Sequence, residues 1–269
     1  MTALRVDPAM TRSSLTHAIV RRVSRSLAAC QLLHLPRQSF DLRRAEAQHA
    51  SYVRALEAAG ATVTVLPELP DLPDATFVED PAVVLDEVAV RCRPGHATRE
   101  AEAAAIAPEI ARLRPVVAID APATLEGGDV LRRGRTLFVG ESSRTNRAGI
   151  EQLRARVGPL GYRVVPVRVT GCLHLKTAAT FPAPGLLLAN ADWVDLGPFA
   201  EVEILRVPPA EAWGANTLPV DGCVLVAASA PQTAALLAAR GLDVRPVDIS
   251  ELQKAEAGLT CLSILCPCG

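Results

Sequence analysis

The chain has 269 residues, of which 49% are hydrophobic, 21% charged and 3% aromatic, and its formal net charge is −1. This length and apolar content allow one large domain or two small ones. The balanced charge, without a basic stripe or an acidic tail, argues against binding to nucleic acid or to an anionic membrane, and the scarcity of aromatic residues argues against base stacking.

No targeting signal or membrane span is expected. Residues 1–12 lack the continuous apolar core of a signal peptide, and the chain contains no run of about 18 apolar residues. It contains seven cysteines, an odd number, most of them beside apolar residues. This usage favours reduced thiols in the cytoplasm over a framework of disulfides.

The predicted elements repeat one order along the chain. A strand at 16–23, a helix at 42–59 and a strand at 61–66 come first, because apolar residues recur at helical spacing up to Gly60 and then alternate. The later predicted segments are strands at 82–85, 88–91 and 116–119 with a helix at 99–112; strands at 130–131, 136–139 and 162–167 with a helix at 145–157; strands at 177–181 and 185–189; and strands at 217–220, 223–227 and 242–247 with a helix at 231–240. A helical turn at 250–254 and an apolar strand at 262–266 follow.

These units open at Phe77, Glu126, His174 and Asn216, about 40–50 residues apart, and a repeat of this length indicates a propeller or a solenoid. The N-terminal unit makes a fifth. Because the general order is strand, strand, helix, strand, we expect a mixed α/β ring formed by a single domain over residues 1–269. In a ring the starts of the units converge on a central channel, where distant residues could meet: Asp80, Glu126, His174 and Cys261.

Cys261 is the candidate nucleophile. Gly258 lets the backbone bend sharply, and the cysteine then lies where a loop enters the strand at 262–266, so its thiol could face a cavity. A small buried hydrophobe is the more common role of a lone cysteine. His174 favours the nucleophilic role of Cys261 over the hydrophobic one, because a histidine beside a thiol can exchange the protons that thiolate chemistry requires. A hydrogen-bonded core histidine is the alternative.

Several acids could form an anionic pocket. Glu126 lies between apolar residues and next to two glycines, so we expect a half-buried carboxylate that needs a cationic partner, either His174 or a substrate. Asp74, Glu79 and Asp80 surround an apolar pair and could bind a guanidinium or ammonium group. A solvated turn and a solvated loop are the respective alternatives.

Arg99 and Arg144 follow polar turns, and either could clamp a carboxylate, although surface arginines are commonplace. Neither a metal nor an organic cofactor is expected. The spacing of Cys261, Cys266 and Cys268 matches no ordinary zinc pattern, and the chain has no glycine-rich phosphate-binding motif.

Seven short motifs now stand in order: LPD at 72–74, FVED at 77–80, RPG at 93–95, LEGGDVL at 125–131, RTN at 144–146, HLK at 174–176 and LTCLS at 259–263. Together they resemble the dimethylargininase (dimethylarginine dimethylaminohydrolase) family of the guanidine-modifying, or pentein, superfamily. The resemblance covers nearly the whole chain and implies a five-bladed α/β propeller.

The resemblance also implies an activity, the hydrolysis of N-omega-methylated arginine to citrulline and an amine. Cys261 matches the nucleophile, His174 the general acid and base, and Glu126 the acid that orients them. The matched substrate-binding positions are Asp74, Glu79 and Asp80 for the guanidinium, Arg99 and Arg144 for the α-carboxylate, and Leu32 and Ala255 for backbone contacts to the amino-acid end.

Lys176 departs from the deiminases and amidinotransferases of the superfamily, which usually have an aspartate two residues after the histidine. The missing carboxylate leaves room for methyl groups. A deiminase or amidinotransferase, and a catalytically silent binder of a cationic amino acid, are the alternatives. The loop at 23–40 is the candidate lid, and we expect a monomer or a homodimer. The sequence leaves the physiological substrate among methylated arginines open.

Overall fold

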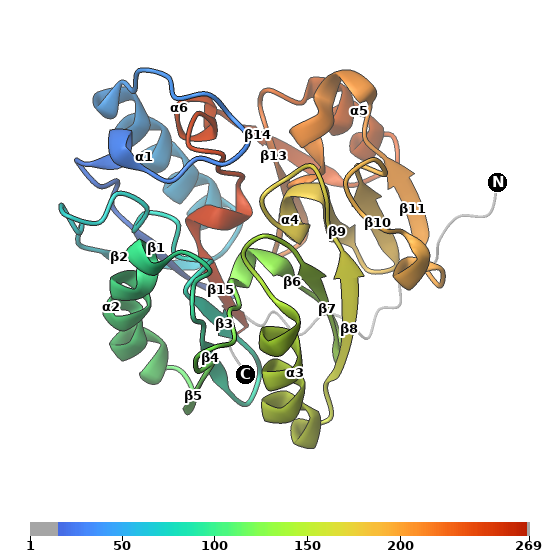
Figure 1. Cartoon of the computed structure of the whole chain (residues 1–269). Helices are drawn as coiled ribbons and strands as arrows, with labels where there is room; N and C mark the ends of the chain where they lie inside the picture. The colour runs from blue at the N-terminus through green and yellow to red at the C-terminus, as the bar shows by residue number, and fades with distance from the viewer. Residues whose placement is uncertain (1–15, 268–269) are drawn as a thin grey trace.

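The computed structural model describes residues 16–267, which form a ring of five three-stranded sheets (Figure 1). Residues 1–12, which we expect not to be a signal peptide, lie outside the described residues, and so does Cys268. The sheets, in hydrogen-bonding order, are β15 (Ile264–Pro267), β1 (Thr16–Arg21) and β2 (Thr62–Leu66); β3 (Ala82–Val84), β4 (Ala89–Arg91) and β5 (Val116–Ala118); β6 (Val130–Arg133), β7 (Thr136–Glu141) and β8 (Arg163–Arg168); β9 (Ala179–Ala183), β10 (Leu186–Ala189) and β11 (Glu203–Arg206); and β12 (Leu218–Val220), β13 (Cys223–Ala227) and β14 (Asp243–Val247). The five-bladed α/β propeller implied by the sequence is confirmed.

All five sheets have the same wiring. The first-named strand pairs antiparallel with the middle strand, and the middle strand pairs parallel with the third. A parallel pair needs a crossover connection, and in four blades a helix provides it. These helices are α1 (Leu42–Ala58), α2 (Glu100–Ala111), α3 (Arg147–Val157) and α5 (Pro231–Ala238). They lie on the perimeter of the ring in Figure 1.

The blade of β9, β10 and β11 differs from the expected repeat. Its crossover contains only a 3₁₀ turn at Gly197–Phe199, and the sequence patterns predict neither this crossover nor β11. Gly197 and Pro198 disfavour a helix there. Phe199 fills the core in place of a helical face, since its ring stacks on Phe138 with centroids 4.4 Å apart.

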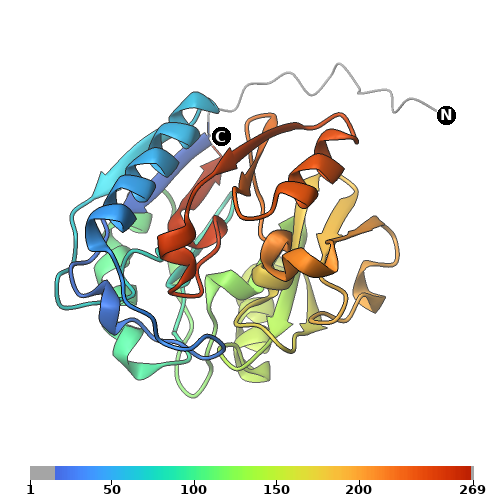
Figure 2. The same ribbon diagram turned by 90° about the horizontal axis from the view of Figure 1, so that it is seen from above.

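The blade that contains β1 closes the ring with strands distant in sequence. β15 pairs antiparallel with β1, with Ile264 opposite Ile19, and Figure 2 shows this red segment beside the blue strand. β15 begins at Ile264, two residues later than predicted, because Leu262 belongs to a 3₁₀ turn at Thr260–Leu262. Cys261 is therefore held in this turn, directly before the strand that closes the ring.

The innermost strands, β3, β6, β9, β12 and β15, contribute residues to a central cavity of about 350 Å³. At one end the cavity reaches three polar residues, Glu79, Lys176 and Thr260. The residues that precede the innermost strands are candidates for the site: Asp80, Glu126, His174, Asn216 and Cys261. The predicted convergence of the unit openings thus has a structural basis.

The prediction that Gly258 provides the bend before Cys261 is wrong. Its φ is not in the left-handed region, whereas that of Glu256 is, at 59°. A glycine is needed at 258 for space, because a Cβ there would lie 2.3 Å from the side chain of Asn216.

Two further α-helices are short, α4 (Leu175–Ala178) and α6 (Ser250–Gln253), and several 3₁₀ turns lie between the elements. Within residues 16–267, no helix has the length and apolar character needed to cross a bilayer.

The two ends of α3 give a matched test of this packing. Gly149 lies in the first turn, where an added Cβ would be 1.9 Å from the carbonyl oxygen of Thr124, whereas Gly158 at the other end has helical φ and ψ and open space around it. Gly149→Ala should lower the free energy of unfolding by about 1–3 kcal/mol through overpacking. Gly158→Ala should change it by less than about 1 kcal/mol, because the entropy that the unfolded chain loses is opposed by crowding of the new Cβ against the ring of Pro159. Urea denaturation measures both, and equal effects would contradict the close contact.

Candidate active site

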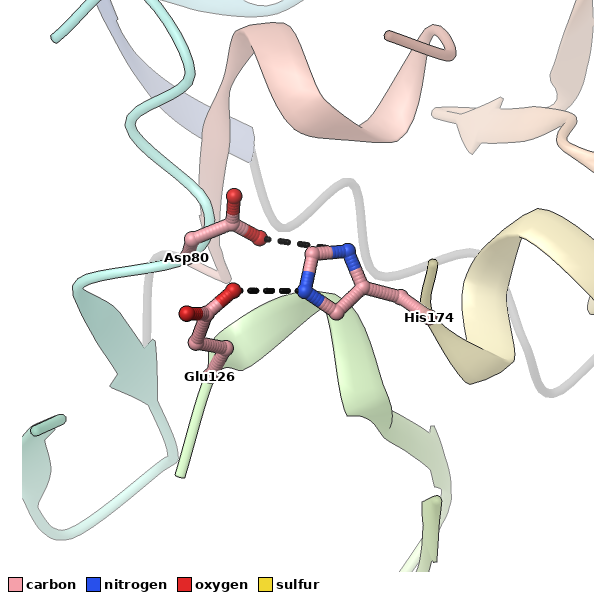
Figure 3. Close-up of side chains that lie close together, drawn as sticks. All are labelled: Asp80, Glu126 and His174. Carbon is pink, nitrogen blue, oxygen red and sulfur yellow. Dashed lines mark hydrogen bonds and ion pairs between the residues drawn. The ribbon is translucent and has the colours of Figure 1, made fainter. Parts of the chain in front are cut away.

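His174 and Glu126 form the centre of the candidate site (Figure 3). The imidazole Nε2 lies 2.6 Å from Oε2 of Glu126, and Nδ1 lies 3.8 Å from Oδ1 of Asp80. The three residues come from the openings of different blades. All are buried, with relative exposures of 2% for His174, 0% for Glu126 and 3% for Asp80. The solvated turn considered for Glu126 is therefore wrong.

Two glycines make this close approach possible. A Cβ at Gly127 would lie 2.0 Å from the carbonyl oxygen of Glu79, and a Cβ at Gly128 would lie 2.7 Å from Nδ1 of His174. Such distances exclude any side chain, so blades can meet here only at glycine. The expectation that this pair lets the backbone approach another group closely is confirmed.

The charges of the cluster shift the pKa values of the pair in opposite directions. Burial lowers the pKa of His174, but the carboxylates of Asp80, Glu126 and Asp129 outweigh burial and raise it to about 9. Burial raises the pKa of Glu126, but His174 and the nearby guanidinium groups of two arginines lower it to about 2. In the absence of a substrate, the favoured state at neutral pH is an imidazolium bound to a carboxylate.

Cys261 is buried, with 8% relative exposure, and its Sγ accepts a hydrogen bond from the backbone N–H of Gly258 at 3.4 Å. Burial raises the pKa of this thiol, and the negative charges of Glu79 and Asp80 raise it further. The charge of Asp80 thus raises the pKa of both the thiol and the imidazole. A cation placed among these groups would favour the thiolate, because it would offset the carboxylates.

Glu79 and Asp80 face different partners. Oε1 of Glu79 bonds Nζ of Lys176, and Oε2 accepts the hydroxyl hydrogen bond of Thr260 at 2.7 Å. Burial raises the pKa of Glu79, although Lys176 opposes this effect. Glu79, Lys176 and Thr260 also line the central cavity, so their bonds form a polar wall of that cavity, and Thr260 directly precedes Cys261 in sequence. The solvated loop considered for these acids is wrong.

Arg99 is deeply engaged with acids in this structure. Its Nη1 donates to Asp80 at 2.6 Å, and its Nε and Nη2 donate to Glu102 at 2.9 and 2.7 Å. Nη2 also lies 3.4 Å from the carbonyl oxygens of Asp74 and Phe77. The surface position considered for Arg99 is therefore wrong. Glu102 was not singled out from the sequence; its spacing of three residues from Arg99 on one helix is the signal that could have found it.

Arg144 is buried too, and its Nη1 lies 3.4 Å from Oε1 of Glu126. The ligand atoms of Asp80, Glu126 and His174 lie within 4.8 Å of one another, a spacing that could accommodate a metal ion. The guanidinium groups already provide positive charge beside two of these ligands. These guanidinium groups therefore offset part of the negative charge that would attract a metal ion.

The remaining predicted residues lie around the loop between β1 and α1. Asp74 is buried, and its carboxylate accepts the N–H of Gln31 at 3.2 Å. Burial raises the pKa of Asp74, whereas Arg99 lowers it. Leu32 is half-buried, Ala255 is buried, and both belong to one hydrophobic cluster that also contains Cys261. Leu32 and Ala255 therefore pack in the same part of the hydrophobic core as the nucleophile.

Asn216 was seen in the sequence only as a unit opening. Its Oδ1 accepts the backbone N–H of Thr260 at 3.1 Å, and its Nδ2 donates to the carbonyl oxygen of Lys176 at 2.9 Å. One amide thus links the segment after His174 to the residue before Cys261. Its place at a repeat opening, shared with Glu126 and His174, was the signal that could have marked it.

Comparisons with known proteins agree with this arrangement, although no family model matches the chain. The N(G),N(G)-dimethylarginine dimethylaminohydrolase of Streptomyces coelicolor is 43% identical over 249 residues, covering 92% of this chain and 95% of the relative. The enzyme of the same name from Pseudomonas aeruginosa is 35% identical over 251 residues, covering 92% and 98%.

Solved structures give the same result. A cysteine-to-serine variant of the Pseudomonas aeruginosa enzyme, complexed with citrulline, superposes with a TM-score of 0.88 at 33% identity, covering 93% of this chain and 98% of that one. A cyanobacterial arginine dihydrolase domain has a TM-score of 0.84 at 19% identity over 93% and 97%, a similarity of fold alone. By its sequence similarity to the two curated enzymes, the chain belongs to the dimethylarginine dimethylaminohydrolase family.

Proposed function

We propose that the protein hydrolyses N-omega-methylated arginines, asymmetric dimethylarginine and monomethylarginine, to citrulline and dimethylamine or methylamine. The observation that carries the proposal is the buried cluster of His174, Glu126 and Asp80. The turn that holds Cys261 is joined to this cluster by the backbone, because the N–H of Glu79, next to Asp80, donates to the carbonyl oxygen of Cys261 at 3.3 Å. The cluster combines a nucleophile, a proton donor and carboxylates suited to a guanidinium.

The chemistry begins with the substrate's own charge. A guanidinium bound beside Glu79 and Asp80 offsets the negative charges that raise the pKa of Cys261, so the thiol releases its proton to solvent and the thiolate forms next to the carbon it attacks. A carbon–sulfur bond forms. The imidazolium of His174, stabilised by Glu126, then gives its proton to the departing dimethylamine as the carbon–nitrogen bond breaks. A covalent thiouronium at Cys261 results.

The second half releases the product. His174, now neutral, takes a proton from water, and the hydroxide oxygen attacks the thiouronium carbon. Collapse of this adduct breaks the carbon–sulfur bond and forms citrulline, while the hydroxyl proton of the adduct passes to the departing sulfur of Cys261. Water is the only other reactant, and the steps balance without a metal or an organic cofactor.

We further propose that Arg99 and Arg144 hold the substrate's α-carboxylate and that backbone groups of Leu32 and Ala255 contact its α-amino group, with Asp74 supporting that end. Arg144 is the better placed arginine, because the structure records one long contact for its guanidinium within the described residues, at 3.4 Å. To bind the α-carboxylate, Arg99 would have to give up some of its hydrogen bonds to Asp80 and Glu102. We also propose a cytoplasmic location, which the six described cysteines support because all are buried free thiols. The protein is proposed to be a single domain that acts as a monomer or a homodimer.

Substrate choice tests the proposal. Asymmetric dimethylarginine should yield equal amounts of citrulline and dimethylamine, whereas unmodified arginine should yield little ammonia, since Lys176 stands where deiminases carry an aspartate. Chromatographic amine analysis measures both. Ammonia from arginine at a comparable rate would indicate a deiminase, and binding of either amino acid without turnover would indicate a silent binder.

Loss of the proton donor should separate thiol reactivity from turnover. His174→Ala should reduce kcat by about a hundredfold or more, because general acid and base catalysis is removed. The Cys261 thiol should still react with iodoacetamide, as measured by mass spectrometry. Cys261→Ser is the control, which should bind substrate but neither alkylate at 261 nor turn over. Near-normal kinetics in His174→Ala would remove this residue from the mechanism.

The charge of Glu79 should control the thiol. The pKa of Cys261 is raised by burial and by Glu79 and Asp80, so alkylation of the free enzyme should rise with pH above the range of an ordinary thiol, near 8.5. Glu79→Gln removes a negative charge and leaves Lys176 unpaired, so the alkylation profile should move to lower pH. Glu211→Gln, at another buried carboxylate in a distant blade, is the control. An upward shift in Glu79→Gln would contradict this electrostatic account.

A further inference from the structure

Two buried carboxylates hold the segment 31–35 of the candidate lid loop. Asp74 accepts the N–H of Gln31. On the other side of Leu32, Oε1 of Glu256 accepts three consecutive backbone N–H groups, those of Leu33, His34 and Leu35, at 2.9, 2.5 and 2.6 Å. Successive backbone N–H groups around one anion form a cradle of considerable strength. Leu32 therefore lies between two charged anchors.

Apolar packing gives the residues that follow Leu32 little support. Leu33 is 54% exposed and His34 is exposed as well. A loop with few buried apolar contacts opens easily unless polar bonds restrain it. The carboxylate of Glu256 is the group that provides such bonds after Leu32.

Glu256 itself occupies an unusual position. It is 3% exposed, its φ of 59° is left-handed for a non-glycine residue, and its Oε2 is buried with no hydrogen-bond partner among the described residues. Backbone strain of this kind persists where the surroundings impose it, often at functional sites. Glu256 follows Ala255 directly, so its side chain bonds the lid loop to the segment that leads to Cys261.

We propose that Glu256 is a positioning residue for the amino-acid end of the substrate. Its carboxylate links the backbone beside Leu32 to the backbone of Ala255. The two backbone segments proposed to contact the α-amino group are thereby held at a fixed distance from each other. This inference rests on the proposed function. It adds a residue that acts through Leu32 and Ala255 and takes no part in the proton transfers of His174.

The proposal predicts a split between binding and chemistry. Loss of the Glu256 charge weakens three bonds to the lid loop, but the contacts of Glu126 with His174 and of Gly258 with Cys261 do not involve it. Substrates that lack the α-amino group gain nothing from the paired backbone contacts. Glu256 should therefore affect KM for the amino acid and leave the rate of the chemical steps nearly unchanged.

The test compares asymmetric dimethylarginine with its analogue that lacks the α-amino group, by steady-state kinetics on the full chain. Glu256→Gln should raise KM for dimethylarginine about tenfold, because neutral hydrogen bonds are roughly half as strong as charge-assisted ones. Its kcat should stay within about twofold, and KM for the analogue should change little. Glu251→Gln is the matched control, since this buried carboxylate binds the other end of the loop at the N–H of Asp41, 2.6 Å away. Its KM values should match those of the wild type.

A second variant guards against misfolding of the first. Leu35→Pro removes one of the three N–H donors without altering Glu256, and it should raise KM for dimethylarginine in the same selective way, by a smaller factor. Equal changes for both substrates, a fall in kcat at constant KM, or unchanged KM in both variants would overturn the proposal. Failure of the wild type to turn over dimethylarginine would instead overturn the proposed function and this inference with it.

Discussion

The short contact between the His174 imidazole and the Glu126 carboxylate is the constraint on which the rest of the site depends. A buried charge is tolerated only beside a partner, and each member of this pair is stabilised by further charges. Asp80 supports the imidazolium, and Arg144 supports Glu126. Because the groups come from different blades, the ring must hold several inner strands in register before any of these charges is paired. The site is therefore stable only when the ring of blades is closed.

A second polar network complements the first on the side of the central cavity. Glu79 is the centre of this second network, because its oxygens bond Lys176 and Thr260. Its charge, like that of Asp80 in the first network, raises the pKa of Cys261. Asn216 joins the same wall to the segment after His174. The turn that carries the nucleophile is thus held by hydrogen bonds on three sides. The site can keep a reactive thiol in place although no strand pairing includes Cys261 itself.

The sequence predicted the ring and the convergence of its openings because both follow from a repeat length. It placed the helices α1, α2, α3 and α5 within a few residues, since periodicity and glycine signals are local. It missed β11, whose crossover has no helical pattern. Nor could it show that Asn216 supports the turn before Cys261 or that Glu256 adopts a left-handed φ. Such features depend on contacts between segments more than about 40 residues apart or on packing space, and neither leaves a local pattern.

The pairing of β15 with β1 has a consequence for how activity is acquired. These strands are separated by most of the described chain, and joining segments so distant in sequence costs loop-closure entropy. The nucleophile is attached directly to this pairing. The position of its sulfur therefore depends on a contact that the other four blades do not provide. Catalytic competence thus requires the two ends of the described chain to be joined.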